Sequence, residues 1–264
     1  MKQICIIFFY FININSISQT IESKTDTSSA INVPNLNNNY QKNDVTHYFL
    51  KLGVGLSASA VSLIIDDEIR DLFNADKKLN NNSLLKIGHT YGDFYYNIYF
   101  SGALILSQFI TDNHEFARTG KALFESIVVG SLFSISLKYI FGRSRPYKRE
   151  GNFKFNWFES ENINNSLPSG HVITAFTTST ILSKWIDNDF ASVFLYGLAG
   201  LTAYQRIETD NHWFSDILLG ASIGYLTAEY FYNQNQIESC GNKSYYVIPF
   251  FSHYSSGVTL SYSF

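Results

Sequence analysis

The sequence reads KYIFGRSRP over residues 138–146, PSGH over residues 168–171 and RIETDNHWFSD over residues 206–216. These polar blocks stand among long apolar stretches. Their candidate site groups are three cations, two histidines and one carboxylate. The groups are Lys138, Arg145, Arg206, His171, His212 and Asp216. Cationic side chains hydrogen-bond to phosphate oxygens, and an activated histidine can attack phosphorus. The three blocks therefore predict a site for a phosphoryl group.

Apolar stretches on either side of the blocks predict an all-α bundle of about six core helices. The expected helices run over about 49–65, 96–110, 122–141, 169–186, 191–204 and 212–232, with short surface helices over 69–93. Acidic residues 66–68 are expected to end the first helix, and Gly142 the third. If the last four helices alternate up and down, the ends that carry the polar blocks meet at one mouth.

Two of the blocks have local features that suit this mouth. Ser169 is a natural N-cap at a helix start, where free N–H groups bind anions, and Gly170 lets the backbone approach a ligand closely. His212 and Asp216 are four residues apart on a predicted helix and should touch. Asp216 would then hold one ring nitrogen protonated and leave the other free to attack. A purely structural His–Asp pair and plain helix capping are the alternatives.

The connector over residues 147–167 must pass over this mouth, because it joins two helix ends that carry polar blocks. It is unusually aromatic, with Phe153, Phe155, Trp157 and Phe158. It is therefore predicted to be ordered. The rings could form an apolar lid that contacts the substrate, or could anchor the connector to the bundle.

The two ends of the chain differ from the bundle. Residues 1–18 have a positive start, an apolar run and small residues, which predicts an export signal; an uncleaved anchor is the alternative. Residues 19–45 are rich in Asn, Ser and Thr and are predicted to be a disordered linker before the helical domain of residues 46–235. At the C-terminal end (244–264), alternating residues over 245–251 and 258–264 predict a β-hairpin packed on the helices. Its terminal Phe resembles an outer-membrane barrel strand, but one hairpin cannot close a barrel.

Composition limits the partners. The net charge of -3 and the sequence pI near 6.1 do not suggest a nucleic-acid binder. Cys5 lies in the export signal, so a processed chain keeps Cys240 and forms no internal disulfide.

The apolar helices suggest membrane association. However, several are short for a bilayer, and the mean hydropathy of -0.04 is low. If every helix spanned the membrane and the N-terminus were exported, the mouth would face the cytoplasm. The alternative is that some helices only pack together or dip into the membrane interface.

Taken together, the blocks resemble the signature of the type 2 phosphatidic acid phosphatase (PAP2) superfamily, which includes the vanadium haloperoxidases. That signature runs Lys, six residues, Arg-Pro; then Pro-Ser-Gly-His; then Ser-Arg, five residues, His, three residues, Asp. This chain departs from it at Gln205, where Ser is usual. The resemblance covers roughly residues 95–232.

The resemblance implies a role for each motif residue. His212 would be the nucleophile through a phosphohistidine, Asp216 its orienting carboxylate and His171 the general acid. The phosphate ligands would be Lys138, Arg145, Ser169, Gly170 and Arg206. No metal or other cofactor is implied, and the remaining histidines, at positions 47, 89, 114 and 253, are expected to be surface or structural.

The expected activity is a metal-independent hydrolase of lipid-linked or small phosphate esters and pyrophosphates, facing the periplasm of a bacterial cell envelope. The alternative is a vanadium-dependent haloperoxidase, since vanadate mimics five-coordinate phosphorus in such a pocket. A helical scaffold with a relic anion site is the non-enzymatic alternative. Phosphate release, set against bromide oxidation with vanadate and peroxide, separates the first two.

Overall fold

The structure, a computed structural model, describes residues 38–74, 83–111, 114–158, 165–240, 244–251 and 256–263. The predicted export signal and most of the predicted linker lie outside these residues. The chain divides into two compact units, Met1–Asp44 and Val45–Phe264. The architecture below concerns the second unit and the helix that leads into it.

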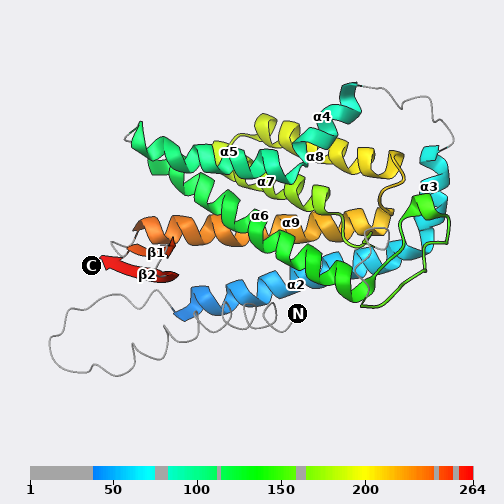
Figure 1. The fold of residues 1–264 in the computed structure, drawn as a ribbon, viewed down its shortest axis with the longest axis horizontal. Helices are drawn as coiled ribbons and strands as arrows, with labels where there is room; N and C mark the ends of the chain where they lie inside the picture. Colours follow the sequence, from blue (N-terminus) through cyan, green and yellow to red (C-terminus); the bar gives the residue numbers. More distant parts are fainter. Residues whose placement is uncertain are drawn as a thin grey trace. The chain divides into compact units, whose positions relative to one another are not determined.

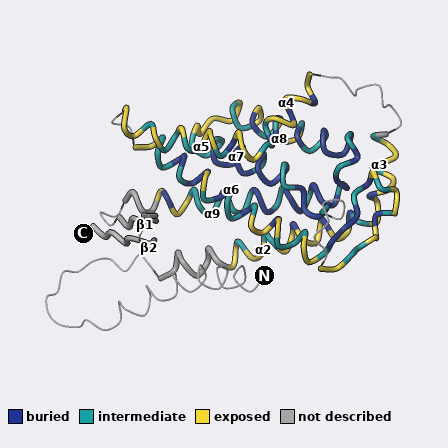
Figure 2. The backbone as a smooth tube through the Cα atoms, viewed as in Figure 1, coloured by how far each residue is buried: buried dark blue, intermediate teal, exposed yellow. Residues whose placement is uncertain are grey.

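The described residues of this unit form a bundle of α-helices, as the apolar stretches predict (Figure 1). In chain order the helices are α2 (Asn38–Ser62), α3 (Asp66–Asn74), α4 (Ser83–Tyr91), α5 (Phe94–Leu106), α6 (His114–Phe141), α7 (Gly170–Ile186), α8 (Asp189–Glu208) and α9 (Phe214–Cys240). Short 3₁₀ turns lie at Leu63–Ile65, Ser107–Phe109 and Pro146–Lys148. Helix α7 packs against α6, α8 and α9, and α9 also packs against α6. Long buried stretches therefore run along α7 and α9 (Figure 2).

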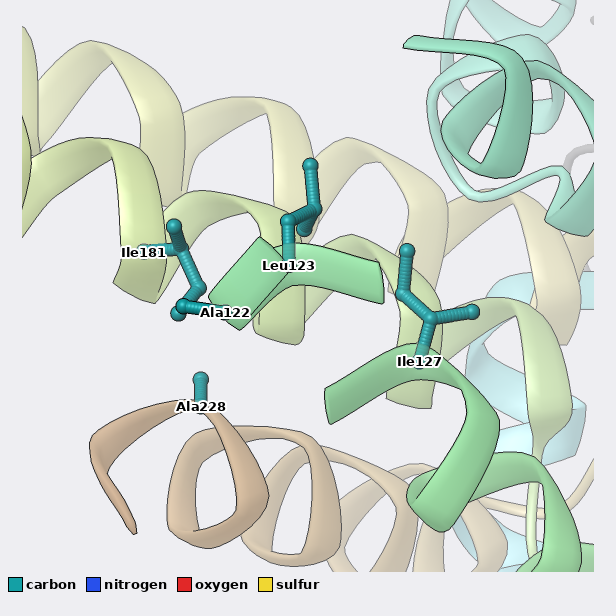
Figure 3. Close-up of a cluster of buried hydrophobic side chains, with 5 residues drawn as sticks. All are labelled: Ala122, Leu123, Ile127, Ile181 and Ala228. Atoms are coloured by element: carbon teal, nitrogen blue, oxygen red, sulfur yellow. The ribbon is translucent and has the colours of Figure 1, made fainter. Parts of the chain in front are cut away.

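The core is built from small and branched side chains that let these helices approach closely. Figure 3 shows Leu123 and Ile127 of α6 beside Ile181 of α7 and Ala228 of α9, all of them fully buried. Nearer the polar blocks, a Cβ added at Gly220 of α9 would lie 2.8 Å from the carbonyl oxygen of Ser169. Only glycine allows this approach, so α9 sets the position at which α7 begins.

The helix ends that carry the polar blocks lie together. The Ser169 amide, at the start of α7, donates to the Asp216 carbonyl in the first turn of α9 (3.1 Å). The Tyr147 amide, after α6, donates to the Asp210 carbonyl, after α8 (3.1 Å). The up-and-down arrangement therefore gathers all three blocks at one end of the bundle.

Several predicted helix limits are wrong. The acidic residues 66–68 do not end a helix: after one 3₁₀ turn they begin α3, where negative charge suits the helix N-terminus. Helix α8 runs past its predicted end and carries Arg206 within it, and α6 begins at His114 instead of 122. Helix α2 begins at Asn38, inside the stretch predicted to be linker. Propensity marks such ends poorly, because packing extends a helix once its apolar face is covered.

Gly142 ends α6, as its sequence predicts, and docks the connector that follows. Its φ is +50°, and a Cβ there would collide with the Asn156 carbonyl oxygen. The connector then folds back beside the helix end: the Asn156 amide donates to the Gly142 carbonyl (3.0 Å), and the Ser144 amide donates to Lys154 (3.0 Å). The described part of the connector is thus ordered against α6.

Two strands lie near the C-terminus, β1 (Ser244–Phe251) and β2 (Ser256–Ser263). They are antiparallel, with Val247 opposite Leu260. The sequence places its hairpin over 245–251 and 258–264; residues 252–255 and 264 lie outside the described part.

Candidate active site

The two motif histidines occupy different kinds of backbone. His171 lies in the first turn of α7, whereas His212 precedes α9 and is only 5% exposed. The His212 Nδ1 atom lies 2.7 Å from the carbonyl oxygen of Ser166 but 3.7 Å from Asp216 Oδ2. The two side chains are therefore in contact, as their spacing predicts, but 3.7 Å exceeds a hydrogen bond, so Asp216 does not itself accept the ring proton. A carbonyl only accepts, so Nδ1 carries the proton and Nε2 keeps its lone pair.

Asp216 acts on His212 partly through Ser166. Its carboxylate accepts from Ser166 Oγ (2.6 Å), the Trp213 amide (2.9 Å) and Arg143 Nη1 (2.6 Å). Ser166 thus bonds the carboxylate with its hydroxyl and the histidine with its carbonyl. Burial alone would raise the pKa of Asp216, but the Arg143 charge and the bonds it accepts hold that pKa below its usual range. Asp216 is therefore a carboxylate at neutral pH.

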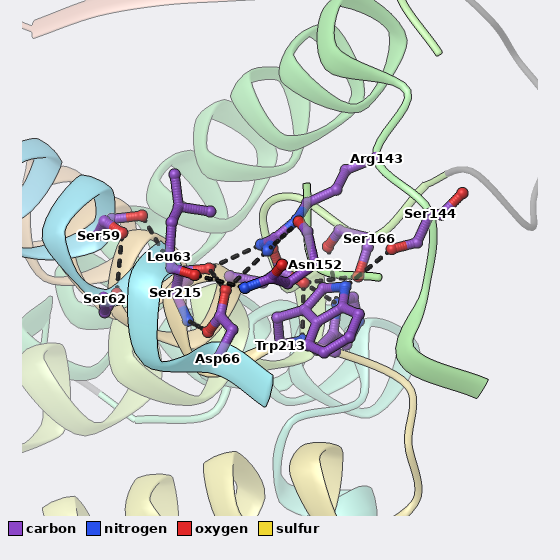
Figure 4. Close-up of polar contacts among 12 residues, drawn as sticks. Ser59, Ser62, Leu63, Asp66, Arg143, Ser144, Asn152, Ser166, Trp213 and Ser215 are labelled. Carbon is purple, nitrogen blue, oxygen red and sulfur yellow. Dashed lines mark hydrogen bonds and ion pairs between the residues drawn. The ribbon is translucent and has the colours of Figure 1, made fainter. Parts of the chain in front are cut away.

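Arg143 links this carboxylate to a second one from a distant part of the chain (Figure 4). Its guanidinium is fully buried and donates to Asp66 Oδ2 (2.7 Å) as well as to Asp216. Ser215 donates its amide to Asp66 Oδ1 (2.8 Å), and Arg143 donates to the Asn152 carbonyl (2.7 Å from Nη2). Sequence analysis missed Asp66, Arg143 and Ser166. The available signals were the first of three acidic residues directly after an apolar stretch and an extra arginine, Arg143, inside the first block.

The three motif cations converge on the histidines. Lys138 Nζ donates to the Asn165 carbonyl, and Arg145 Nη1 donates to Asn211 Oδ1 (3.3 Å). Arg206 Nε donates to the Gln205 side-chain oxygen. Gln205, where the superfamily usually has Ser, is therefore a buried acceptor that orients the arginine.

The start of α7 leaves polar atoms without partners. Ser169 stands at the N-cap position as predicted, but its hydroxyl makes no capping bond. Ser169 Oγ, His171 Nε2 and Arg145 Nε are buried and have no hydrogen-bond partner. A Cβ at Gly170 would meet only Ser134 Oγ, at 3.7 Å, so the backbone there is open. Buried polar atoms without partners cost about 1–3 kcal/mol each, and an anion held there would satisfy them.

Burial and the surrounding positive charge act on both histidines. Burial, followed by Arg206, lowers the pKa of His171 to about 3. Burial, with Lys138 and Arg145 against the opposing Asp216, lowers the pKa of His212 to about 4. Both rings are therefore neutral at pH 7 before an anion arrives, and an anion would favour their protonation.

His89 also lies beside His171, and the prediction of a surface or structural role misses this. The two ring centroids are 5.0 Å apart, and one ligand atom from each of His89, Asp93 and His171 lies within 4.8 Å of the others. Such a trio could hold a metal ion, which the sequence did not indicate. However, the Arg206 charge acts on both histidines and opposes a divalent cation there. His47 and His114 are exposed, and His253 lies outside the described residues.

Comparisons with known proteins place the chain beside one family and two relatives. Residues 119–239 match the family described as the PAP2 superfamily. A lipid A 1-phosphatase of Porphyromonas gingivalis is 37% identical over 94 residues, which is 35% of this chain but only 18% of that protein. The crystal structure of Aquifex aeolicus LpxE has a TM-score of 0.49 at 24% identity, covering 64% of this chain and 95% of that one.

Proposed function

Since the chain belongs to the PAP2 superfamily, we propose that it is a metal-independent phosphatase that hydrolyses lipid-linked phosphates through a phosphohistidine on His212. The observation that carries this proposal is the bond from His212 Nδ1 to the Ser166 carbonyl. It leaves Nε2 as a nucleophile in a pocket with cations on one side and His171 on the other.

The first step forms the phosphohistidine. His212 Nε2 attacks phosphorus while the bond from phosphorus to the leaving oxygen breaks, and His171 Nε2 gives its proton to that oxygen. The Asp216 carboxylate stabilises the positive charge that develops on the His212 ring. Proton donation of this kind contributes about 10²–10⁴ in rate.

The second step restores the enzyme. Water attacks phosphorus and gives its proton to His171, the bond from phosphorus to nitrogen breaks, and the electron pair returns to His212 Nε2. Charge spreads over the equatorial oxygens in both steps, and Lys138, Arg145 and Arg206 would hold these oxygens together with Ser169 and Gly170. Three fixed cations supply the positive charge that many phosphoryl-transfer enzymes obtain from a metal.

Exposed apolar surface supports a lipid substrate. Phe153, Trp157 and Phe158 of the connector are 58–64% exposed, whereas Phe155 packs into the core. Trp157 stacks on Phe155 with ring centroids 5.7 Å apart, and Phe158 packs edge-on against Tyr139 (6.0 Å). One face of each ring thus anchors the connector, and the exposed remainder is available to a substrate. An apolar surface beside a cationic pocket suits a phosphate on an apolar group. The name of the P. gingivalis relative adds lipid A to the substrates to be tried.

Membrane association follows from the same kind of surface. The stretches Thr46–Phe73 and His114–Phe141 are long and apolar enough to cross a membrane, and only 17% and 28% of their most apolar windows are buried. Phe49, Val61 and Ile64 are more than two-thirds exposed. We propose that the protein sits at the envelope membrane with its mouth toward the periplasm. A C-terminal reporter active only in the periplasm should work, and one active only in the cytoplasm would overturn this orientation.

The decisive test of the activity uses the full-length protein in detergent with EDTA. The panel is phosphatidate, phosphatidylglycerophosphate, a polyprenyl diphosphate, lipid A and p-nitrophenyl phosphate. Phosphate release that survives EDTA, is inhibited by vanadate and is lost in His212→Asn but not in His114→Asn supports the proposal. Activity lost in EDTA and restored by magnesium or zinc argues against it. Bromide oxidation with vanadate and peroxide, without phosphate release, would favour the haloperoxidase.

The substrate class has its own test. Replacing Trp157 and Phe158 by Ser should raise KM several-fold for lipid phosphates and leave p-nitrophenyl phosphate unchanged, because only the lipid reaches the connector. If both substrates suffer alike, or only thermal stability falls, the rings are structural.

A further inference from the structure

The corner between α4 and α5 is built tightly against the start of α7. A Cβ added at Gly92 would lie 2.7 Å from the His171 carbonyl oxygen, so the corner touches the backbone of that histidine. Asn97 Nδ2 donates to the Tyr91 and Asp93 carbonyls (both 2.8 Å), and Thr178 Oγ1 of α7 donates to Asn97 Oδ1 (2.7 Å). These bonds fix the corner relative to α7.

This corner presents two titratable side chains to His171. His89 lies in the last turn of α4 with its ring centroid 5.0 Å from that of His171. Asp93 caps α5 and accepts from the Tyr95 amide (2.9 Å) and the Tyr96 amide (3.3 Å). Ligand atoms of all three residues lie within 4.8 Å of one another. A rotation of the His89 ring would therefore be enough to bring one of its nitrogens into hydrogen-bond range of His171.

The two histidines differ in their access to water. His89 is exposed, whereas His171 Nε2 is buried and has no partner. A phosphate ester bound at the start of α7 would cover His171 from the pocket side. His89, which is exposed and lies beside His171, then offers a route from solvent to that ring.

We propose that His89, which lies beside Asp93, relays protons between solvent and His171, so that His171 can take up its proton while substrate covers its other side. This inference rests on the proposed function, because it assigns a proton supply to the general acid of that reaction. His89 touches no reacting atom; it is a positioning residue that acts through His171.

The charges around the pair explain why a supply is needed. His171 faces Arg206, His89, His212 and Lys138, and burial and these groups hold its pKa far below that of an ordinary histidine. The pKa of His89 is lowered by partial burial and Arg206, but Asp93 opposes the shift. His89 therefore accepts a proton more readily than His171 does.

The proton balance of the relay is simple. When a dianionic ester binds, its charge favours protonated His171; His89 gives up one proton to that ring and takes one from water or buffer. His171 then passes its proton to the leaving oxygen. In the second step the attacking water returns a proton to His171. When phosphate leaves, the ring becomes neutral again and that proton returns to solvent through His89, so that relay and reaction together consume only ester and water.

Comparing two esters distinguishes loss of the relay from general damage to the site, because the aryl leaving group of p-nitrophenyl phosphate needs no proton. His89→Gly should lower kcat on an alkyl phosphate roughly 10- to 100-fold, a part of what general acid catalysis supplies. It should leave kcat on p-nitrophenyl phosphate unchanged. Lys86→Ala, at an exposed position on the same helix, is the matched control and should leave both rates unchanged.

Chemical rescue is the second measurement. Because His89 is exposed, added imidazole should restore the alkyl-ester rate of His89→Gly in proportion to its concentration, and should not affect wild type. Asp93→Asn keeps a capping side chain but removes the charge, so the alkaline limb of its alkyl-ester rate profile should move to lower pH.

The relay is overturned if His89→Gly turns over alkyl esters like wild type, if it loses both substrates equally, or if imidazole gives no rescue. It is also overturned if chelator abolishes wild-type activity and Zn²⁺ binding is lost in His89→Gly, since the trio then holds a metal. Failure of the proposed function looks different: His212→Asn would retain turnover on both esters.

Discussion

The two sides of the proposed phosphate site are built on opposite principles. On the nucleophile side, His212 and Asp216 are buried and bonded to Ser166, Arg143 and the backbone. On the acid side, Ser169 Oγ and His171 Nε2 are buried without any hydrogen-bond partner. The nucleophile must have its tautomer and orientation set before substrate binds, so its bonds are made by the protein. The acid side meets the phosphate and the leaving oxygen, so its bonds are left for the substrate.

The comparison has an energetic consequence. Bonds on the nucleophile side stabilise the fold, and removing one partner from a buried ionic network is strongly destabilising. Unpaired buried atoms on the acid side lower the free energy of unfolding, and only a bound ligand offsets this loss. Variants on the first side should therefore lose both stability and turnover, whereas variants on the second should lose binding or proton transfer alone.

The largest expected effect is on the nucleophile. His212→Ala should abolish turnover of every ester, because the proposed mechanism assigns the attack on phosphorus to His212 Nε2. His171→Ala should abolish alkyl esters but retain part of the aryl phosphate activity, since an aryloxide leaves without a proton. Steady-state kinetics on both esters tests this division, and equal losses for the two variants on both substrates would count against it.

The next largest effect is on the buried arginine. Arg143→Met should lower the free energy of unfolding by about 3–5 kcal/mol, because it leaves the Asp66 and Asp216 carboxylates buried without their shared cation. Denaturant unfolding in detergent measures this, with exposed Arg149→Met as the control. A loss no larger than that of the control would show that the network does not hold the site together.

A matched pair of serines sharpens the comparison. Ser166→Ala should cost about 1–3 kcal/mol of stability, because its hydroxyl bonds buried Asp216, and should lower kcat more than it raises KM. Ser169→Ala should leave stability the same or raise it, since it removes a buried hydroxyl that has no partner, but should weaken vanadate inhibition. Thermal unfolding and vanadate titration of both variants test this difference. The same stability loss for both variants would remove the distinction between the two sides.

The smallest effect concerns pH. The folded pKa values of His171 and His212, about 3 and about 4, lie below the ordinary histidine value of about 6.5, so the unfolded chain binds more protons between these values. The stability from these neutral rings is fully present above pH 6.5 and is lost as pH falls toward 4. The melting temperature should fall over this window, less so with bound vanadate, which favours the protonated rings. His171→Gln should flatten the fall, and an unchanged slope in that variant would contradict the assignment.

Much of the fold was predictable from the pattern of apolar segments. The all-α bundle, the end of α6 at Gly142 and the meeting of the motif-bearing helix ends all followed from helix periodicity and alternation. Helix limits were less predictable: Asp66 begins α3 because its carboxylate is buried against Arg143, a partner 77 residues away. The sequence does not reveal the buried partner of such a carboxylate, so a carboxylate directly after an apolar stretch is interpreted as a helix end.

By itself, the sequence predicted which residues carry the proposed phosphate chemistry, because side-chain type and spacing define Lys138, His171, His212 and Asp216 directly. Only the tertiary structure decided what each one bonds. The partner of His212 is a backbone carbonyl, which every residue possesses and which therefore leaves no mark in a sequence. Asp66 and His89 reach the pocket through packing between distant helices, and a contact across the bundle depends on where whole elements dock, not on the residues next to it in the chain.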